Sequence, residues 1–194
     1  MKRTLLFVLA LAVIPVGVDA QVTPSASCAA LSVESPLDYV LLCAEQGNVY
    51  AQGTLGFKYS IGYGVPEDDV EAVRWFRLAA EQGNAGAQFY LGNMYGNGDG
   101  VPEDDVEAAR WMRLAAEQGN ARAQSRLGAL YALGYGVPED DVLAYMWFNL
   151  AAAQGDESAQ NNKDIIEERM TREQIAEAQR MSREWMAEHP RDGN

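Results

Sequence analysis

Three identical acidic triplets are the first candidates for chemistry in this sequence. Glu-Asp-Asp stands at residues 67–69, 103–105 and 139–141, each time directly after Val-Pro. Clustered carboxylates can bind divalent cations, which prefer oxygen ligands. The same residues can instead cap a following helix, because acids at a helix N-terminus accept hydrogen bonds from its free amides and favour its dipole. Since every triplet has the same neighbours, we favour capping and predict no metal site.

Residues for catalysis are otherwise scarce. The chain has one histidine, His189, which stands beside Pro190, and two cysteines. So few of these residues exclude most Ser-His-Asp triads and most zinc sites. The motifs H-E-x-x-H, G-x-S-x-G, Walker A and S-x-x-K are absent from the sequence. We therefore expect no catalytic residues and no cofactor, and a solvated His189 at a helix end.

The overall charge limits the class of partner. The 194 residues include 15 Lys and Arg against 28 Asp and Glu, a net charge of −13. Nucleic acids and anionic membrane surfaces both attract basic patches. We therefore expect no nucleic-acid partner. Hydrophobic residues make up 48 % of the chain, enough to fold around a core.

The first twenty residues have the layout of a secretory signal peptide. Lys2 and Arg3 precede an apolar run over residues 5–14, and Val18-Asp19-Ala20 resembles a cleavage site. The apolar run is shorter than the roughly 20 residues that a membrane-spanning helix needs. We predict cleavage after Ala20, no membrane insertion after cleavage, and a periplasmic or secreted protein. A retained N-terminal anchor is the alternative.

Export changes the expectation for Cys28 and Cys43. In an oxidising compartment an even pair of cysteines is a disulfide candidate. A bond between them would close a short loop and contribute about 3 kcal/mol in the chain-entropy model. Two unpaired small core residues are the alternative, and we favour the disulfide.

The central part of the sequence consists of three copies of one unit. Residues 49–84, 85–120 and 121–156 repeat with a period of 36 residues. Repeats of this length indicate a solenoid or an array. Each unit reads as two helices joined by a glycine-rich loop, so the sequence predicts an all-α fold.

A Gly-Asn pair precedes the first helix of each unit, and Gly155-Asp156 precedes the residues after the third unit. Such a pair can end one helix and cap the next. In the first unit the first helix carries Ala51, Leu55 and Tyr59 as one apolar stripe. Gly56 stands beside this stripe. Because glycine costs helix stability, we expect it to permit a close approach between helices.

The second helix of the first unit begins after Asp68. We expect Asp68 to cap it and to form a capping box with Glu71. Its inward face holds a tryptophan between two alanines, and the equivalent tryptophans are Trp75, Trp111 and Trp147. An aromatic binding ladder is one interpretation of these residues. Large side chains between small ones favour the other interpretation, core positions.

The repeated residues resemble a known family. The pattern A-x-A-Q-x-x-L-G-x-x-Y, then G-x-G-V-P-x-D, then A-x-x-W-x-x-x-A-A-x-Q-G-N is similar to the Sel1-like repeat, a relative of the tetratricopeptide repeat. Its residues in the first unit are Ala51, Gln52, Leu55, Gly56, Tyr59, Gly62, Gly64, Val65, Asp68, Ala72, Trp75, Ala79, Ala80, Gln82 and Gly83. The resemblance implies a right-handed α-solenoid of helix-turn-helix repeats, a tetratricopeptide-like superhelix.

The sequence on either side of the repeats predicts caps. Residues 21–34 are expected to be a tail and residues 35–48 a capping helix, with Ser35 as its cap and Pro36 in its first position. Residues 157–190 are expected to form C-terminal capping helices, followed by a tail over residues 191–194. Thr171 and Gln174 predict a capping box at the start of the last of these helices.

Binding is expected where the three copies differ, because packing constrains those positions least. By analogy with tetratricopeptide solenoids, the first helices line a concave groove. The variable positions there are Tyr50, Gly53, Phe57, Ser60, Gly86, Phe89, Asn93, Arg122, Ser125 and Ala129. Of these we select as partner-binding residues Tyr50, Phe57, Phe89, Asn93, Arg122 and Ser125. Simple tolerance of substitution at exposed positions is the alternative.

The resemblance and the missing catalytic motifs together predict a non-enzymatic protein–protein interaction module. It would act as an adaptor or regulator in the bacterial periplasm and bind a peptide or protein of the cell envelope in its concave groove. A β-lactamase-like or penicillin-binding enzyme is one alternative, because cysteine-rich members of the family are described so. Those members carry a cysteine pair in each repeat, which all three units here lack. A structural or cell-wall-associated spacer is the other alternative.

Overall fold

The computed structural model describes residue 28 and residues 31–190 of the chain. The predicted signal peptide, most of the predicted tail and residues 191–194 lie outside the described residues. Within the described part, every regular element is an α-helix. The helices are α2 (Leu37–Glu45), α3 (Val49–Ile61), α4 (Asp69–Glu81), α5 (Ala85–Asn97), α6 (Asp105–Glu117), α7 (Ala121–Leu133), α8 (Asp141–Ala152), α9 (Glu157–Glu167) and α10 (Arg172–Glu188).

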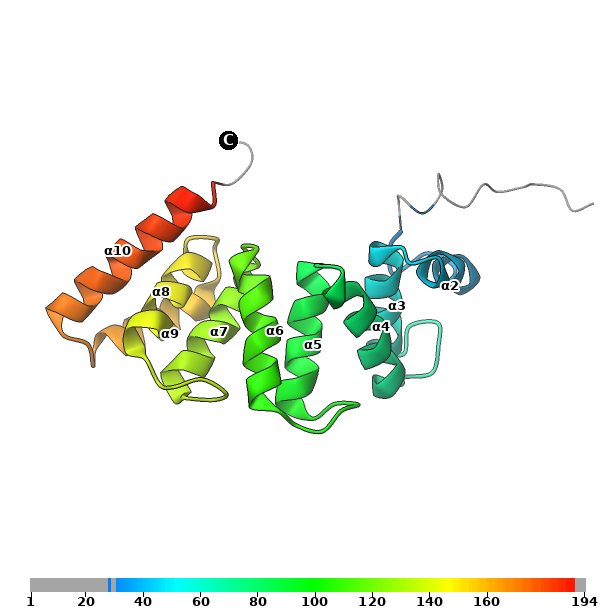
Figure 1. Cartoon of the computed structure of the whole chain (residues 1–194), viewed down its shortest axis with the longest axis horizontal. Coiled ribbons are helices and arrows are strands. Elements are labelled where there is room, and N and C mark those ends of the chain that lie inside the picture. Colours follow the sequence, from blue (N-terminus) through cyan, green and yellow to red (C-terminus); the bar gives the residue numbers. More distant parts are fainter. Residues whose placement is uncertain (1–27, 29–30, 191–194) are drawn as a thin grey trace, which may run out of the picture.

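The helices stack in chain order along one axis, from α2 at one end to α10 at the other (Figure 1). The pairs α3 and α4, α5 and α6, and α7 and α8 form the three units. From α2 to α9 each helix packs on the next one along the chain, whereas α10 packs on α8. The prediction of an all-α solenoid is therefore confirmed.

Asparagine caps start the first helix of every unit. Asn48, Asn84 and Asn120 each accept a hydrogen bond from the backbone amide three residues later, at 2.8–3.0 Å. The glycine before each asparagine has a φ of 83–89°, which favours glycine and reverses the chain after the preceding helix. One dipeptide thus ends one helix and begins the next.

Aspartate caps start the second helices, but the predicted capping box is wrong. The Asp68 carboxylate accepts a hydrogen bond from the Glu71 amide at 3.0 Å, as expected. The reciprocal bond does not form, because the Asp68 amide already donates to the Tyr59 carbonyl oxygen at 3.0 Å. The Glu71 carboxylate pairs with Arg74 instead. The predicted capping box between Thr171 and Gln174 is present in both directions.

The N-terminal cap also begins differently from the prediction. Pro36, not Ser35, precedes α2, and no side chain caps this helix. The Ser35 hydroxyl instead accepts a hydrogen bond from the Ser32 amide at 3.1 Å and closes a turn. The buried Lys58 ammonium donates to the Val33 carbonyl oxygen at 2.6 Å, so the segment before α2 is bound to α3.

The structure contains a disulfide between Cys28 and Cys43, with 6.0 Å between the two Cα atoms. Both cysteines are buried, and they belong to the hydrophobic cluster that α2, α3 and Trp75 form at this end. The bond therefore attaches the N-terminal segment to the buried side of α2.

Glycine in the first helix sets the distance between the two helices of a unit. A Cβ atom at Gly56 would lie 2.7 Å from Cδ1 of Phe76, and one at Gly128 would lie 2.8 Å from Cδ1 of Phe148. At Gly92 the neighbouring atom is Cε of Met112, at 3.0 Å. No side chain fits at these positions without movement, so the expected close approach is present.

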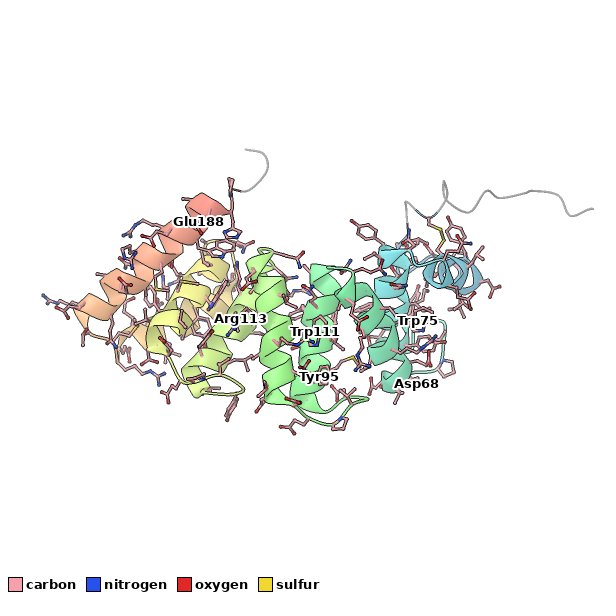
Figure 2. All side chains as sticks on the ribbon, in the orientation of Figure 1. Asp68, Trp75, Tyr95, Trp111, Arg113 and Glu188 are labelled. Atoms are coloured by element: carbon pink, nitrogen blue, oxygen red, sulfur yellow. A yellow bond between two sulfur atoms is a disulfide. The ribbon has the colours of Figure 1, made fainter. Side chains whose placement is uncertain are left out.

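The three equivalent tryptophans are core residues. Trp75, Trp111 and Trp147 lie in the second helices and are 4–6 % exposed. Figure 2 labels Trp75 on α4 and Trp111 on α6. They pack into successive hydrophobic clusters along the solenoid axis. Their burial excludes the interpretation of an exposed aromatic ladder.

Buried glutamines connect each unit to the one before it. The Gln88 side chain donates to the Ala80 carbonyl oxygen at 3.1 Å and accepts from the Gln118 amide at 2.7 Å. Gln124 makes the equivalent bonds to Ala116 at 3.1 Å and from Gln154 at 2.7 Å. We call this series, which begins at Gln52, the glutamine ladder.

A second hydrogen bond joins the same neighbouring units. The Arg77 guanidinium of α4 donates to the Tyr95 hydroxyl of α5 at 2.8 Å. The Arg113 guanidinium of α6 donates to the Tyr131 hydroxyl of α7 at 2.6 Å, and Figure 2 labels Tyr95 and Arg113. Each junction therefore has a polar contact besides the glutamine ladder.

The C-terminal helices end the series. Asp164 of α9 stands where the units have their packing glycine, and the exposed Gln160 bonds to Asp164 instead of entering the ladder. Helix α10 covers α8 through small buried side chains, Ala178 and Ser182. Burial raises the pKa of Tyr145 in α8, whose hydroxyl accepts a hydrogen bond from Gln179 of α10.

The ladder predicts different costs for the same substitution at two equivalent positions. Gln124→Ala removes two hydrogen bonds and leaves a cavity in a fully buried place, so we expect the free energy of unfolding to fall by about 2–4 kcal/mol. Gln160→Ala, at the exposed end of the register, should change it by less than about 0.5 kcal/mol. Urea unfolding measures both, and equal losses would contradict the role of the ladder.

The packing glycine gives a second matched pair, within α3. Gly56→Ala places a methyl group against the Phe76 ring, and overpacking of this kind costs about 1–3 kcal/mol. A Cβ at Gly53 meets nothing within 4 Å, so Gly53→Ala should raise stability by up to about 1 kcal/mol through helix propensity. Opposite shifts of the unfolding midpoint are expected. A stable Gly56→Ala variant would show that the contact is not limiting.

Candidate partner-binding groove

Three hollows follow one another along the face that the first helices share. The first lies between α3 and α5, the second between α5 and α7, and the third between α7 and α9. Their volumes are about 320, 240 and 330 Å³. We call this row of hollows the groove. It runs across all three units and onto the C-terminal cap.

The first hollow is aromatic. Tyr50 and Phe57 of α3 and Tyr90 of α5 line it, with Phe76 beneath. The Tyr90 ring stacks on Phe76 with centroids 5.1 Å apart and meets Phe57 at 5.5 Å. Tyr50 is the most exposed large hydrophobic side chain of the described residues, at 71 %. Leu31 and Val33 of the N-terminal segment close this end of the groove.

The second hollow combines an apolar floor with polar edges. Its apolar lining includes Met112, Ala129 and Leu130, and the polar side chains at it include Asn93 and Arg126. Gly92 and Gly96 leave room where a side chain would fill the space. The second hollow therefore suits a ligand whose apolar side chain is flanked by groups that accept hydrogen bonds.

The third hollow continues the second without a break. Ala129 and Leu133 line both, and Ile165 of α9 extends the apolar surface toward the cap, where Arg169, just after α9, also lines the hollow. Leu133 and Ile165 are 60 % and 63 % exposed. The Arg169 guanidinium is already bound to the Ala132 carbonyl oxygen and to the carboxylate of Asp141. It therefore binds the segment after α9 to α7 and α8.

The structure places only half of the selected residues at the hollows. Tyr50 and Phe57 line the first hollow, and Asn93 lines the second. Phe89 packs against the C-terminal hydrophobic cluster and meets Tyr90 edge-on at 5.4 Å. Arg122 is exposed and Ser125 is half-buried, and neither lines a hollow.

Sequence reasoning missed one register of the groove. Thr54, Tyr90 and Arg126 occupy the same position in the three units, differ in every copy, and line the hollows. Helical spacing could have identified them. These positions lie four residues after Tyr50 and its equivalents, so the two sets share one face of their helices. Leu133 and Ile165 were missed as well.

The acidic triplets are structural. They begin the second helices, and the glycine-rich loop of the next unit lies directly over two of them. A Cβ at Gly100 or Gly136 would collide with the carbonyl of Asp69 or Asp105. In the described part of the chain, no group of three or more His, Cys, Asp or Glu side chains is arranged to hold a metal ion. His189 is exposed and stacks on Trp185 at the end of α10, with centroids 4.3 Å apart.

The three units match the family model described as Sel1 repeat, over residues 49–84, 85–120 and 121–156. The chain belongs to the Sel1 repeat family. Sel1 repeats are typically protein-interaction modules, a scaffold that is generally non-enzymatic. None of the curated proteins compared with this Sel1 repeat chain matches it.

Two solved structures share this Sel1 architecture. A Sel1 repeat protein from Oxalobacter formigenes is 42 % identical with a TM-score of 0.61, over 66 % of this chain and 96 % of that chain. A protective antigen of uropathogenic Escherichia coli strains, which displays an SLR fold, is 32 % identical with a TM-score of 0.61, over 77 % of this chain. The match spans 40 % of the antigen's length.

None of the helices formed by residues 31–190 is both long and apolar enough to cross a membrane.

Proposed function

We propose that this Sel1 repeat protein is an exported, non-enzymatic adaptor or regulator that binds a peptide or protein of the cell envelope in its groove. The observation that carries the proposal is the row of three hollows on the face where the copies differ most. Large apolar side chains are exposed along this row, those of Tyr50, Leu133 and Ile165. Exposed apolar surface in a groove favours docking of another chain.

Export is supported by three independent features. Residues 1–20 have the composition of a signal peptide, Cys28 and Cys43 are joined by a disulfide, and a solved relative is a protective antigen. Disulfides persist in oxidising compartments such as the periplasm. Together they favour a periplasmic or secreted protein over a cytosolic one.

Paired substitutions on two faces test the groove. The chain from residue 21 onward, immobilised, is expected to retain a partner from its own envelope extract. Leu133→Ser with Ile165→Ser should weaken this binding at least about tenfold, because both side chains lose apolar contact with the partner. Val70→Ser with Val106→Ser, on α4 and α6, removes side chains that are equally exposed, at 64 % each. This control should bind like the unmodified chain.

The same samples separate the other functions. Loss of binding in the control and not in the groove variant would contradict the groove. Retention of muropeptides or glycan in place of protein would favour a cell-wall spacer. Hydrolysis of a β-lactam by the unmodified chain would favour an enzyme.

The disulfide gives a test of export. In the full chain expressed with residues 1–20, the periplasmic product should begin at Gln21 and contain no free thiol. Reduction should lower its unfolding free energy by about 3 kcal/mol, because the closed loop constrains the unfolded chain. The Cys28→Ser, Cys43→Ala variant should not respond to the reductant. Free thiols in the periplasmic protein would contradict the proposal.

A further inference from the structure

Acidic residues are absent from the first helices of the three units, which line most of the groove. Helices α3, α5 and α7 contain no Asp or Glu, although the chain holds 28. Their charged residues are Lys58, Arg122 and Arg126, all basic. The second helices, in contrast, each begin with an aspartate. Within the three units the charge is therefore divided between two sets of helices, and the first helices are the cationic set. Helix α9, which completes the third hollow, holds Glu157, Asp164 and Glu167, but none of them lines that hollow.

Two arginines on α7 have no partner within the described chain. Arg122 and Arg126 are exposed, and neither forms a hydrogen bond or an ion pair with any described residue. They lie one helical turn apart, and like charges at this spacing destabilise a helix by about 0.2–0.5 kcal/mol. The fold does not need them, because the equivalent positions hold Tyr50 and Thr54 in the first unit, which are uncharged.

Arg126 lies where an acidic group would be bound beside an apolar one. It lines the second hollow with Asn93 and Tyr135, whose side chains can donate hydrogen bonds. One acid, Asp105, also lines this hollow, and it lies in the first turn of α6, where a carboxylate is favourable. Asn97, which lines the hollow as well, donates a hydrogen bond to Asp99 at 3.0 Å.

We propose that the groove takes an acidic peptide segment of a partner protein. Its bulky apolar side chains occupy the second and third hollows, and its carboxylates pair with Arg122 and Arg126. Charge complementarity selects such a segment: guanidinium groups bind carboxylates with strong, directed hydrogen bonds, whereas the acids of the second helices repel the same segment elsewhere. The inference rests on the proposed function and specifies the chemistry of its partner.

A displayed library of random twelve-residue peptides tests this directly. Selected on the chain from residue 21 onward, binders should be enriched in Asp and Glu together with Leu, Ile, Phe or Tyr. Arg122→Gln with Arg126→Gln should weaken the Kd of a selected peptide about tenfold or more, because charge-assisted hydrogen bonds are lost. Changing the peptide's acids to amides should have a similar effect. The two losses should not add, since they remove the same pairs.

Arg172→Gln with Arg183→Gln is the matched control. These arginines of α10 are exposed and equally without an ion pair, so the variant has the same net charge as the groove variant. Its Kd should stay within about twofold. Equal weakening in both variants would show that net charge acts without a site and would overturn the inference.

The remaining outcomes separate this inference from the proposed function. Neutral or basic binders that lose affinity with Leu133→Ser and Ile165→Ser, but not with the arginine variant, would overturn the acidic partner and leave the groove in place. Binders that neither variant affects would overturn both. If no peptide is selected and phosphatidylglycerol vesicles bind through Arg122 and Arg126, the anionic ligand is a lipid headgroup, and the acidic peptide is rejected.

Discussion

The buried glutamine of each first helix is the constraint on which the spacing of the units depends. Gln88 and Gln124 lie in the core, where an unpaired amide would cost more than the hydrogen bonds gain. The side-chain nitrogen of each glutamine needs a backbone carbonyl at the C-terminal end of the preceding unit's second helix. Its side-chain oxygen needs a second glutamine, which follows the second helix of its own unit. A small rotation between units would break the bond to the preceding helix and leave the buried amide nitrogen of the glutamine unpaired. The repeat therefore stacks in one geometry, and the hollows on the opposite register inherit their spacing from it.

Repetition separates the residues that build the solenoid from those that are free to vary. Caps, packing glycines and tryptophans recur because each unit meets its neighbours in the same way. Once these contacts are made, the positions of the first helices that line the hollows do not have to hold one residue type. That freedom explains why one register can hold Thr54, Tyr90 and Arg126 without a change in the backbone of the helix.

Most of the fold could be predicted from the sequence, because caps, close approaches and core faces depend on short spacings that recur. The failures were contacts set by more distant groups. The box at Asp68 fails because Tyr59 takes its amide, and Ser35 does not cap α2 because it bonds to Ser32. Part of the groove was missed for a related reason. Comparing copies identifies variable positions, but the hollows also include Ile165 of α9, which lies outside the three copies, so only the packed helices place it there.

The net charge of the chain describes the scaffold and not the binding face. Much of the acidity belongs to caps such as Asp68, Asp104 and Asp140, which stabilise the second helices and are required wherever a unit begins one. Adding units multiplies this charge without changing the groove. The net negative charge of the molecule repels an acidic segment at long range. Attraction between the segment and the groove acts only over distances near the Debye length, about 8 Å at physiological ionic strength. Two unpaired arginines on one turn of α7 supply a local field of that range, so recognition depends on their position and not on the total charge.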